Sequence, residues 1–149
     1  MKTIPLPNAQ HNTLSGSRAI FKTATAVVAA LFTWFLVATV LNLALRAWWP
    51  NYHEAETSFG FTLAMKLARL ALGAISSVSA GFVAAWIGKN GMTAATLSGI
   101  ALLALFIPGH YRIWDRFPVW YHLTFLLSLL PLTLLGAVLK YKARRKAPW

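Results

Sequence analysis

Four long apolar segments, separated by short polar connections, constrain this chain more than any other feature of its sequence. They cover about residues 23–45, 61–87, 92–107 and 118–139. A helix rises about 1.5 Å per residue, so about 20 apolar residues cross the roughly 30 Å hydrocarbon core of a bilayer. The sequence therefore predicts an all-α, polytopic integral membrane protein whose four transmembrane helices form an antiparallel bundle.

The composition also favours a membrane over an aqueous environment. Hydrophobic residues make up 58% of the chain and charged residues only 11%, whereas about a quarter of the residues of a soluble domain are charged. A surface this apolar needs a nonpolar solvent. The lipid bilayer is the first partner that the sequence predicts.

The formal net charge is +11. The placement of its cations indicates a membrane topology rather than nucleic-acid binding. Nucleic-acid-binding proteins gather Lys and Arg on a folded polar face, but here these residues lie mainly at the ends of apolar segments. The positive-inside rule places the side with more cations in the cytoplasm. That side holds both termini and Lys89. We therefore expect a multi-pass protein of the cell inner membrane with cytoplasmic N and C termini.

Three regions follow from this topology. Residues 1–22 form a polar cytoplasmic tail, loosely ordered as far as residue 17, and residues 23–139 form the transmembrane domain. Residues 140–149 form a basic cytoplasmic tail, whose cations are expected to bind anionic lipid headgroups. Within the domain, Pro108 and Gly109 are expected to end the third helix. Pro131 removes one backbone hydrogen bond from the fourth helix and predicts a kink there.

Small residues recur every four positions in the second segment, at Gly73, Ser77, Gly81 and Ala85. Side chains four residues apart share one face of a helix. In lipid, rows of small residues let two helix backbones approach closely. The row predicts a packing surface within the bundle. The alternative is an interface in a homo-oligomer or in a larger membrane complex.

Polar side chains gather on the side predicted to face outward, where all three acids of the chain lie. Arg69 falls inside the second segment, where a cation is costly unless it is paired. We expect it to pair with Asp115 or with a glutamate of the first loop. His122 is expected to act as a proton-responsive group or as an interfacial histidine that donates to a backbone carbonyl. The candidate polar site comprises Arg69, Lys66, Asp115, Glu54, Glu56, Arg112, His110 and His122.

The sequence offers little for catalysis or cofactor binding. It has no cysteine, which removes thiol chemistry and iron–sulfur clusters. The histidine spacing matches no zinc motif, and haem is unexpected because only His122 is placed within a segment. No cofactor is predicted. The interpretation favoured here is a non-catalytic accessory, assembly or structural component of the membrane. The alternatives are a small anion or proton transporter or channel, and then a membrane enzyme acting on a lipid or quinone.

Overall fold

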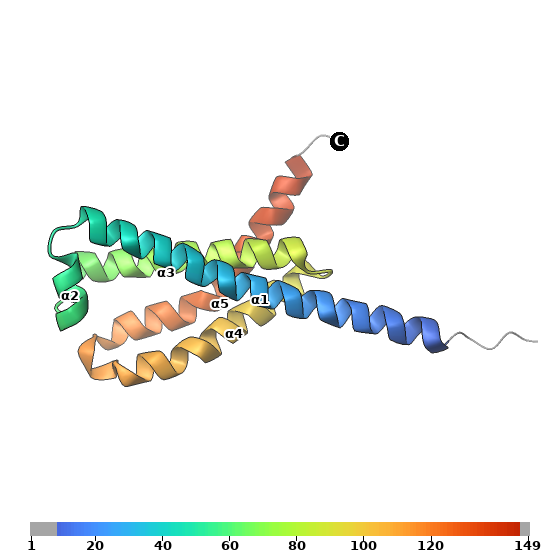
Figure 1. Cartoon of the computed structure of the whole chain (residues 1–149), viewed down its shortest axis with the longest axis horizontal. Helices are drawn as coiled ribbons and strands as arrows, with labels where there is room; N and C mark the ends of the chain where they lie inside the picture. The colour runs from blue at the N-terminus through green and yellow to red at the C-terminus, as the bar shows by residue number, and fades with distance from the viewer. Residues whose placement is uncertain (1–8, 147–149) are drawn as a thin grey trace, which may run out of the picture.

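The computed structural model describes the backbone of residues 9–146 and the side chains of residues 18–145, and this part of the chain is helical without strands. The predicted all-α fold is confirmed. Four of the helices are long and apolar enough to cross a membrane, as expected of a multi-pass membrane protein. Figure 1 shows the elements in chain order: α1 (Ala9–Trp48), α2 (Tyr52–Ser58), α3 (Leu63–Ile87), α4 (Gly91–Arg112), the 3-10 turn η1 (Trp114–Arg116) and α5 (Val119–Lys146).

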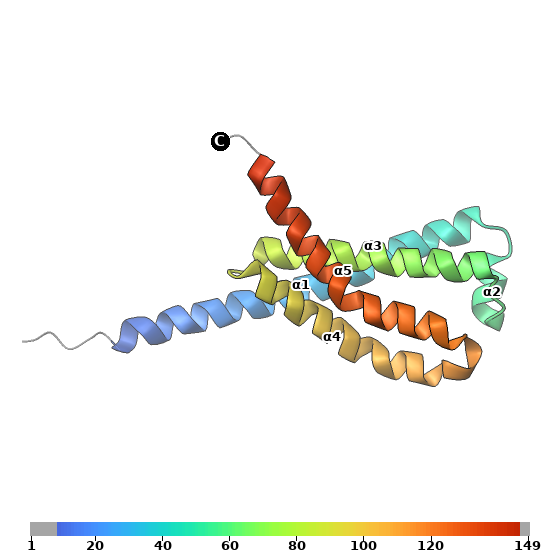
Figure 2. The ribbon, with the colours of Figure 1, turned by 180° about the vertical axis from the view of Figure 1, so that it is seen from behind.

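Helix α3 is the centre of the arrangement, because it contacts each of the other three long helices. Helices α4 and α5 pack on one another, and α1 packs on α3 and α4. At the end that carries α2, here called the α2 end, α4 and α5 diverge from α1 and α3 (Figure 1). Helix α5, which contains Pro131, changes direction partway along its length (Figure 2). Its C-terminal part crosses α3 and leaves the bundle.

Side-chain caps and two left-handed residues fix the connections between the helices. The Thr62 hydroxyl accepts a hydrogen bond from the Met65 amide at the start of α3, and the Asn90 side chain accepts one from the Thr93 amide at the start of α4. Both satisfy amides that have no partner within the helix. Asn51 and Phe59 adopt positive φ angles of 63° and 59° and bracket α2. These two turns fold α2 back over the end of the bundle.

The small-residue row on α3 is buried within the single chain. A Cβ built on Gly81 would overlap the backbone carbonyl of Thr133 on α5, and one built on Gly136 would overlap the backbone of Val78 on α3. The two helices therefore touch backbone to backbone at their crossing. Nearby, the Ser77 hydroxyl accepts a hydrogen bond of 3.0 Å from the indole of Trp34 on α1. The row thus packs α3 against α1 and α5.

The rest of the row behaves in the same way. A Cβ on Gly73 would lie 2.8 Å from the ring of Phe125 on α5, and Ala85 is buried. Since all four residues of the row are covered within one chain, an oligomer or complex would have to use a different face.

Three boundaries differ from the sequence-based expectations. The third helix does not end at Pro108 but continues to Arg112, because proline removes one hydrogen bond without preventing the next turn from forming when neighbouring helices pack around it. The expected loose tail is helical from Ala9 onward, since no proline interrupts the chain between Pro7 and Pro50. Residues 1–8 lie outside the described residues. The last helix continues into the basic tail as far as Lys146.

Replacing Gly81 with Leu is expected to destabilise the protein by at least about 2 kcal/mol, because the new side chain would separate the α3 and α5 backbones. Thermal unfolding of the purified protein in detergent measures this effect. The matched control is Gly109→Leu in α4, where a Cβ meets no atom within 4 Å. Equal thermal stability of the two variants would contradict the close crossing.

Candidate functional site

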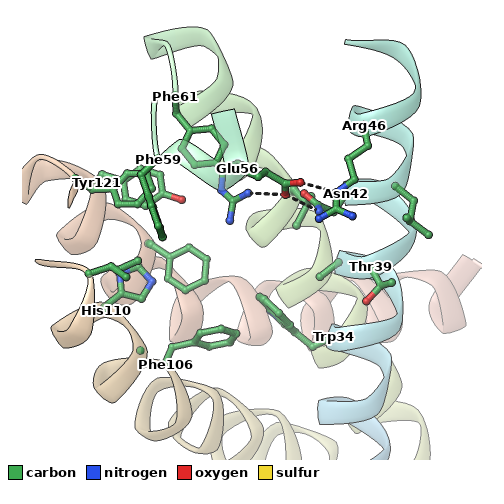
Figure 3. Close-up of a pocket in the computed structure, with 18 residues that line it drawn as sticks. Trp34, Thr39, Asn42, Arg46, Glu56, Phe59, Phe61, Phe106, His110 and Tyr121 are labelled. Atoms are coloured by element: carbon green, nitrogen blue, oxygen red, sulfur yellow. Dashed lines mark hydrogen bonds and ion pairs between the residues drawn. The ribbon is translucent and has the colours of Figure 1, made fainter. Parts of the chain in front are cut away.

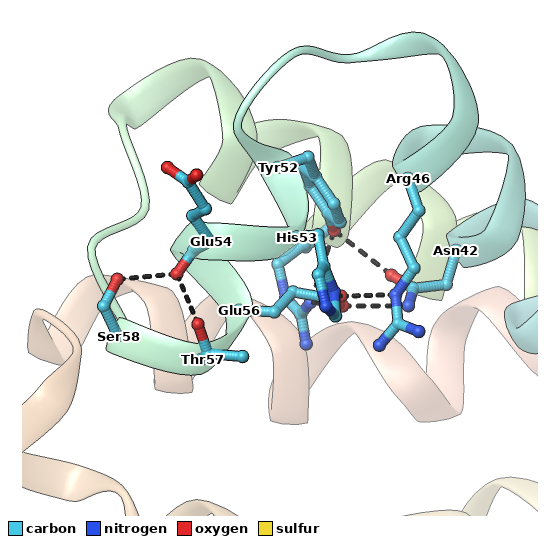
Figure 4. A network of polar contacts seen from close by, with 9 residues as sticks. Asn42, Arg46, Tyr52, His53, Glu54, Glu56, Thr57 and Ser58 are labelled. Atoms are coloured by element: carbon cyan, nitrogen blue, oxygen red, sulfur yellow. Dashed lines mark hydrogen bonds and ion pairs between the residues drawn. The ribbon is translucent and has the colours of Figure 1, made fainter.

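One carboxylate, Glu56 of α2, organises the polar groups at the α2 end (Figure 4). Its Oε1 accepts hydrogen bonds from the Asn42 amide at 2.9 Å and from Arg69 Nη1 at 3.3 Å. Its Oε2 accepts one from Arg46 Nε. The side chain of Glu56 is only 13% exposed. Three helices, α1, α2 and α3, are therefore joined through a single acidic residue.

Tyr52, the first residue of α2, completes this network. Its hydroxyl donates to the Asn42 carbonyl at 3.2 Å and accepts from Arg69 Nη1 at 3.3 Å. The ring is fully buried and packs edge-on against Phe61. The Arg69 guanidinium lies 4.7 Å from the centre of the Phe61 ring, in a cation–π arrangement. Arg69 is thus held by a carboxylate, a phenol and an aromatic face.

The network shifts the acid–base properties of two groups on α2. Burial alone would raise the pKa of Glu56, but hydrogen bonds from Asn42 and Arg46, together with the charges of Arg46 and Arg69, outweigh it and lower that pKa. Burial raises the pKa of Tyr52, and the neighbouring Arg69 only partly opposes this. Around neutral pH, the network therefore contains an ionised glutamate and a neutral tyrosine.

Below this network lies a pocket of about 630 Å³ (Figure 3). Its polar wall, at the α2 end, carries Asn42, Arg46, Glu56 and Arg69, and the remaining walls are mainly aromatic. The pocket opens between α1 and α4, beside the end of α2. Its exposed lining residues are Thr39, Leu43 and Arg46 of α1, Phe59 directly after α2, and Gly109 of α4. Its aromatic lining consists of Trp34, Phe59, Phe61, Phe106, Phe117, Tyr121 and Phe125.

Two histidines meet beside the pocket. His110 of α4 and His122 of α5 approach through their Nδ1 atoms at 2.8 Å. His122 Nε2 lies 3.3 Å from the backbone oxygen of Trp114, and the Trp114 and His122 rings stack with centroids 4.6 Å apart. His110 lines the pocket, where its ring stacks on Phe125. His122 is fully buried behind it.

The structure separates the predicted site residues into two groups. It confirms that Arg69 pairs with a glutamate of the first loop, Glu56, and it brings His110 together with His122. The side chains of the other four form no ion pair with described residues. Glu54, for example, points away from the network (Figure 4). Those four residues are Lys66, Glu54, Asp115 and Arg112.

Two expectations about these residues need correction. Asp115 lies on the exposed turn η1 and is not the partner of Arg69, because that turn follows α4 on the far side of the pocket. The assumption that His122 alone lies within a membrane-spanning helix is also wrong. Helix α4 continues past Pro108 and carries His110 inward. Of the two roles expected for His122, its contact with the backbone oxygen of Trp114 favours the second, an interfacial histidine that donates to a backbone carbonyl.

The sequence-based search missed several residues of the site. Asn42 is the clearest, because it is a polar residue inside the first apolar segment, four positions before Arg46, and so shares a helix face with it. That spacing was a usable signal. The aromatic walls gave none, because aromatic residues at helix ends equally suit the membrane interface.

Comparison of the chain with protein-family models, curated protein sequences and solved structures gives no match. The function proposed below therefore rests on the geometry of the pocket and of the two polar groups beside it.

Replacing Glu56 with Gln is expected to destabilise the protein by about 1–3 kcal/mol, because the variant leaves Arg69 partly buried without a counter-charge. The contact with Arg46 contributes less, since that side chain is 42% exposed. Thermal unfolding in detergent measures the loss. Glu54→Gln is the matched control, because its exposed side chain forms no ion pair and its loss should leave the stability unchanged. An equal effect of both substitutions would refute the central role of Glu56.

The lowered pKa of Glu56 also predicts an acid dependence of stability. Its contribution is fully present above the ordinary glutamate pKa of about 4.3 and is lost as the pH falls through the lower pKa of the folded state. Unfolding midpoints measured from neutral to acid pH should therefore fall more steeply for the wild type than for Glu56→Gln. Glu54→Gln should retain the steep dependence, since it keeps Glu56.

Proposed function

We propose that this chain is an accessory membrane protein that binds an amphipathic, lipid-soluble molecule in the pocket between α1 and α4. One observation carries the proposal: a pocket of about 630 Å³ with charged groups on one wall and aromatic rings on the others. Ligand pockets usually measure about 300–1,000 Å³ and combine an apolar lining with a few polar groups. A molecule with a polar head and an apolar body matches both walls.

The direction of the opening supports a ligand that arrives through the membrane. All exposed residues at the rim except Phe59 lie on α1 and α4, and both of these helices are apolar enough to span the bilayer. A lipid-soluble molecule reaches such a lateral opening without crossing water. The polar wall lies near the ends of α1 and α3, where headgroups and water meet the hydrocarbon.

The tight packing at the end of the pocket away from its polar wall favours ligand binding over conduction. Trp34 and Phe125 are buried there and belong to the same packed cluster as Leu102 and Leu129, which are almost completely covered. Beyond them, α3 and α5 touch at Gly81. A transporter or channel needs a path through this layer, whereas a binding protein needs only the one opening.

The proposed setting is the cell inner membrane with both termini in the cytoplasm. The positive-inside rule supports it, because the cations Lys140, Lys142, Arg144 and Arg145 follow the apolar part of α5 at the end opposite α2. These cations are proposed to contact anionic lipid headgroups. The pocket then opens into the outer half of the bilayer.

Filling the pocket tests the proposal. Gly109 lines it, and a Cβ built there meets no atom within 4 Å, so Gly109→Trp has room for its side chain and should narrow the pocket without unfolding the bundle. Mass spectrometry of small molecules extracted from the gently purified protein should find a bound lipid-soluble compound in the wild type and at least tenfold less in the variant. Ile107→Trp, on the exposed surface of α4 outside the pocket, is the control. Equal retention by all three proteins would refute the binding function.

A further inference from the structure

The hydrogen bonds of the two histidines fix which nitrogen carries each proton when both rings are neutral. The backbone oxygen of Trp114 only accepts, so His122 Nε2 must carry the hydrogen that points to it. A neutral imidazole has a single N–H, and His122 Nδ1 is therefore an acceptor. The 2.8 Å contact between the two Nδ1 atoms then requires the hydrogen to sit on His110 Nδ1.

This chain of bonds leaves His110 Nε2 as a lone-pair acceptor. His110 is 7% exposed and lines the pocket, and no described protein group donates to its Nε2. The rings around it, Phe106, Tyr121 and Phe125, pack against the imidazole. Among the described residues only Arg69 Nε is a fully buried side-chain nitrogen or oxygen without a partner, so His110 Nε2 still reaches the open space of the pocket, where a ligand hydroxyl can donate to it. The pocket thus presents one unmatched acceptor among aromatic faces.

The opposite polar wall has the reverse character. Arg46 and Arg69 bring several N–H donors around the single carboxylate of Glu56, and their charges leave the wall with a net positive charge. A polar head in this pocket therefore meets donors on one side and an acceptor, His110 Nε2, on the other. The lining between them is aromatic (Figure 3), which suits a flat ring because aromatic rings pack well against one another.

We propose, on the basis of the ligand-binding function above, that the pocket selects a lipid-soluble phenol: an aromatic head whose hydroxyl donates to His110 Nε2, attached to an apolar chain. A hydroquinone fits best, since its second oxygen is free to accept from Arg46 or Arg69. The corresponding quinone lacks a hydroxyl donor and leaves His110 unmatched. The tautomers set by Trp114 and His122 therefore discriminate between the reduced and the oxidised ring.

Binding of four probes to the full chain in lipid nanodiscs, kept without oxygen at pH 8, tests this selectivity. The probes are a decyl-substituted hydroquinone, its dimethyl ether, its quinone, and a decylphenol with one hydroxyl. The hydroquinone should bind about tenfold more tightly than the ether and the quinone, since about one hydrogen bond separates them. The decylphenol should bind more tightly than the ether and more weakly than the hydroquinone, because it keeps the hydroxyl donor but lacks the second oxygen. A phenol as weak as the ether would overturn the hydrogen bond to His110.

Two variants connect the selectivity to the histidine. His110→Leu should abolish the difference between the hydroquinone and its ether, and His53→Leu, which changes an exposed histidine of α2, should preserve it. Equal binding of hydroquinone, ether and quinone to the wild type would overturn the inference without any variant. If Gly109→Trp still abolished that unselective binding, the proposed binding function would stand while the phenol selectivity would fail. Absence of binding by every probe would also overturn the inference, and the extraction experiment judges the binding function separately.

Discussion

The close crossing of α3 and α5 at Gly81 and Gly136 is the contact on which the rest of the structure depends. In lipid, helices gain little from burying apolar side chains, so association relies on close packing of surfaces. Two glycines facing opposite backbones provide that packing at one level of the bundle. Toward the α2 end, larger side chains take over: Gly73 there meets the ring of Phe125 rather than a backbone. The helices separate at that end (Figure 1). The pocket lies between them.

Helices that separate in this way need a further contact at the α2 end to fix their positions. Helix α2 provides it by placing Glu56 among Asn42, Arg46 and Arg69. The arrangement resolves two costs together, because a cation within a membrane helix needs a counter-charge and a shielded carboxylate needs donors. The lowered pKa of Glu56 reflects these donors and charges, while Arg69 Nε remains buried without a partner among the described residues. The same groups that fix α2 also give the pocket its polar wall.

The sequence predicted the helical architecture well because the signals for it are local. Apolar length defines the four spans, and the pairing of Arg69 with a loop glutamate follows from the cost of its position. The continuation of α4 through Pro108 was not predictable in the same way, since it depends on neighbouring helices. That single boundary decides whether His110 lies in a loop or within the bundle. The contact between His110 and His122 could therefore not be predicted from the sequence, because it depends on both the continuation of α4 and the position of α5.

The depths of the polar groups along the helix axes indicate that a ligand in the pocket has one preferred orientation. At about 1.5 Å per residue, Arg46 and His110 lie about 3 Å from the ends of their helices and Arg69 about 9 Å from the start of α3. All three are thus near one membrane interface, while Trp34, 14 residues before the end of α1, lies about 21 Å from that end. An amphipathic molecule in that leaflet already holds its head at the interface and its chain in the hydrocarbon. It could enter between α1 and α4 without turning over, so the cost of binding is mainly the loss of motion rather than of solvation.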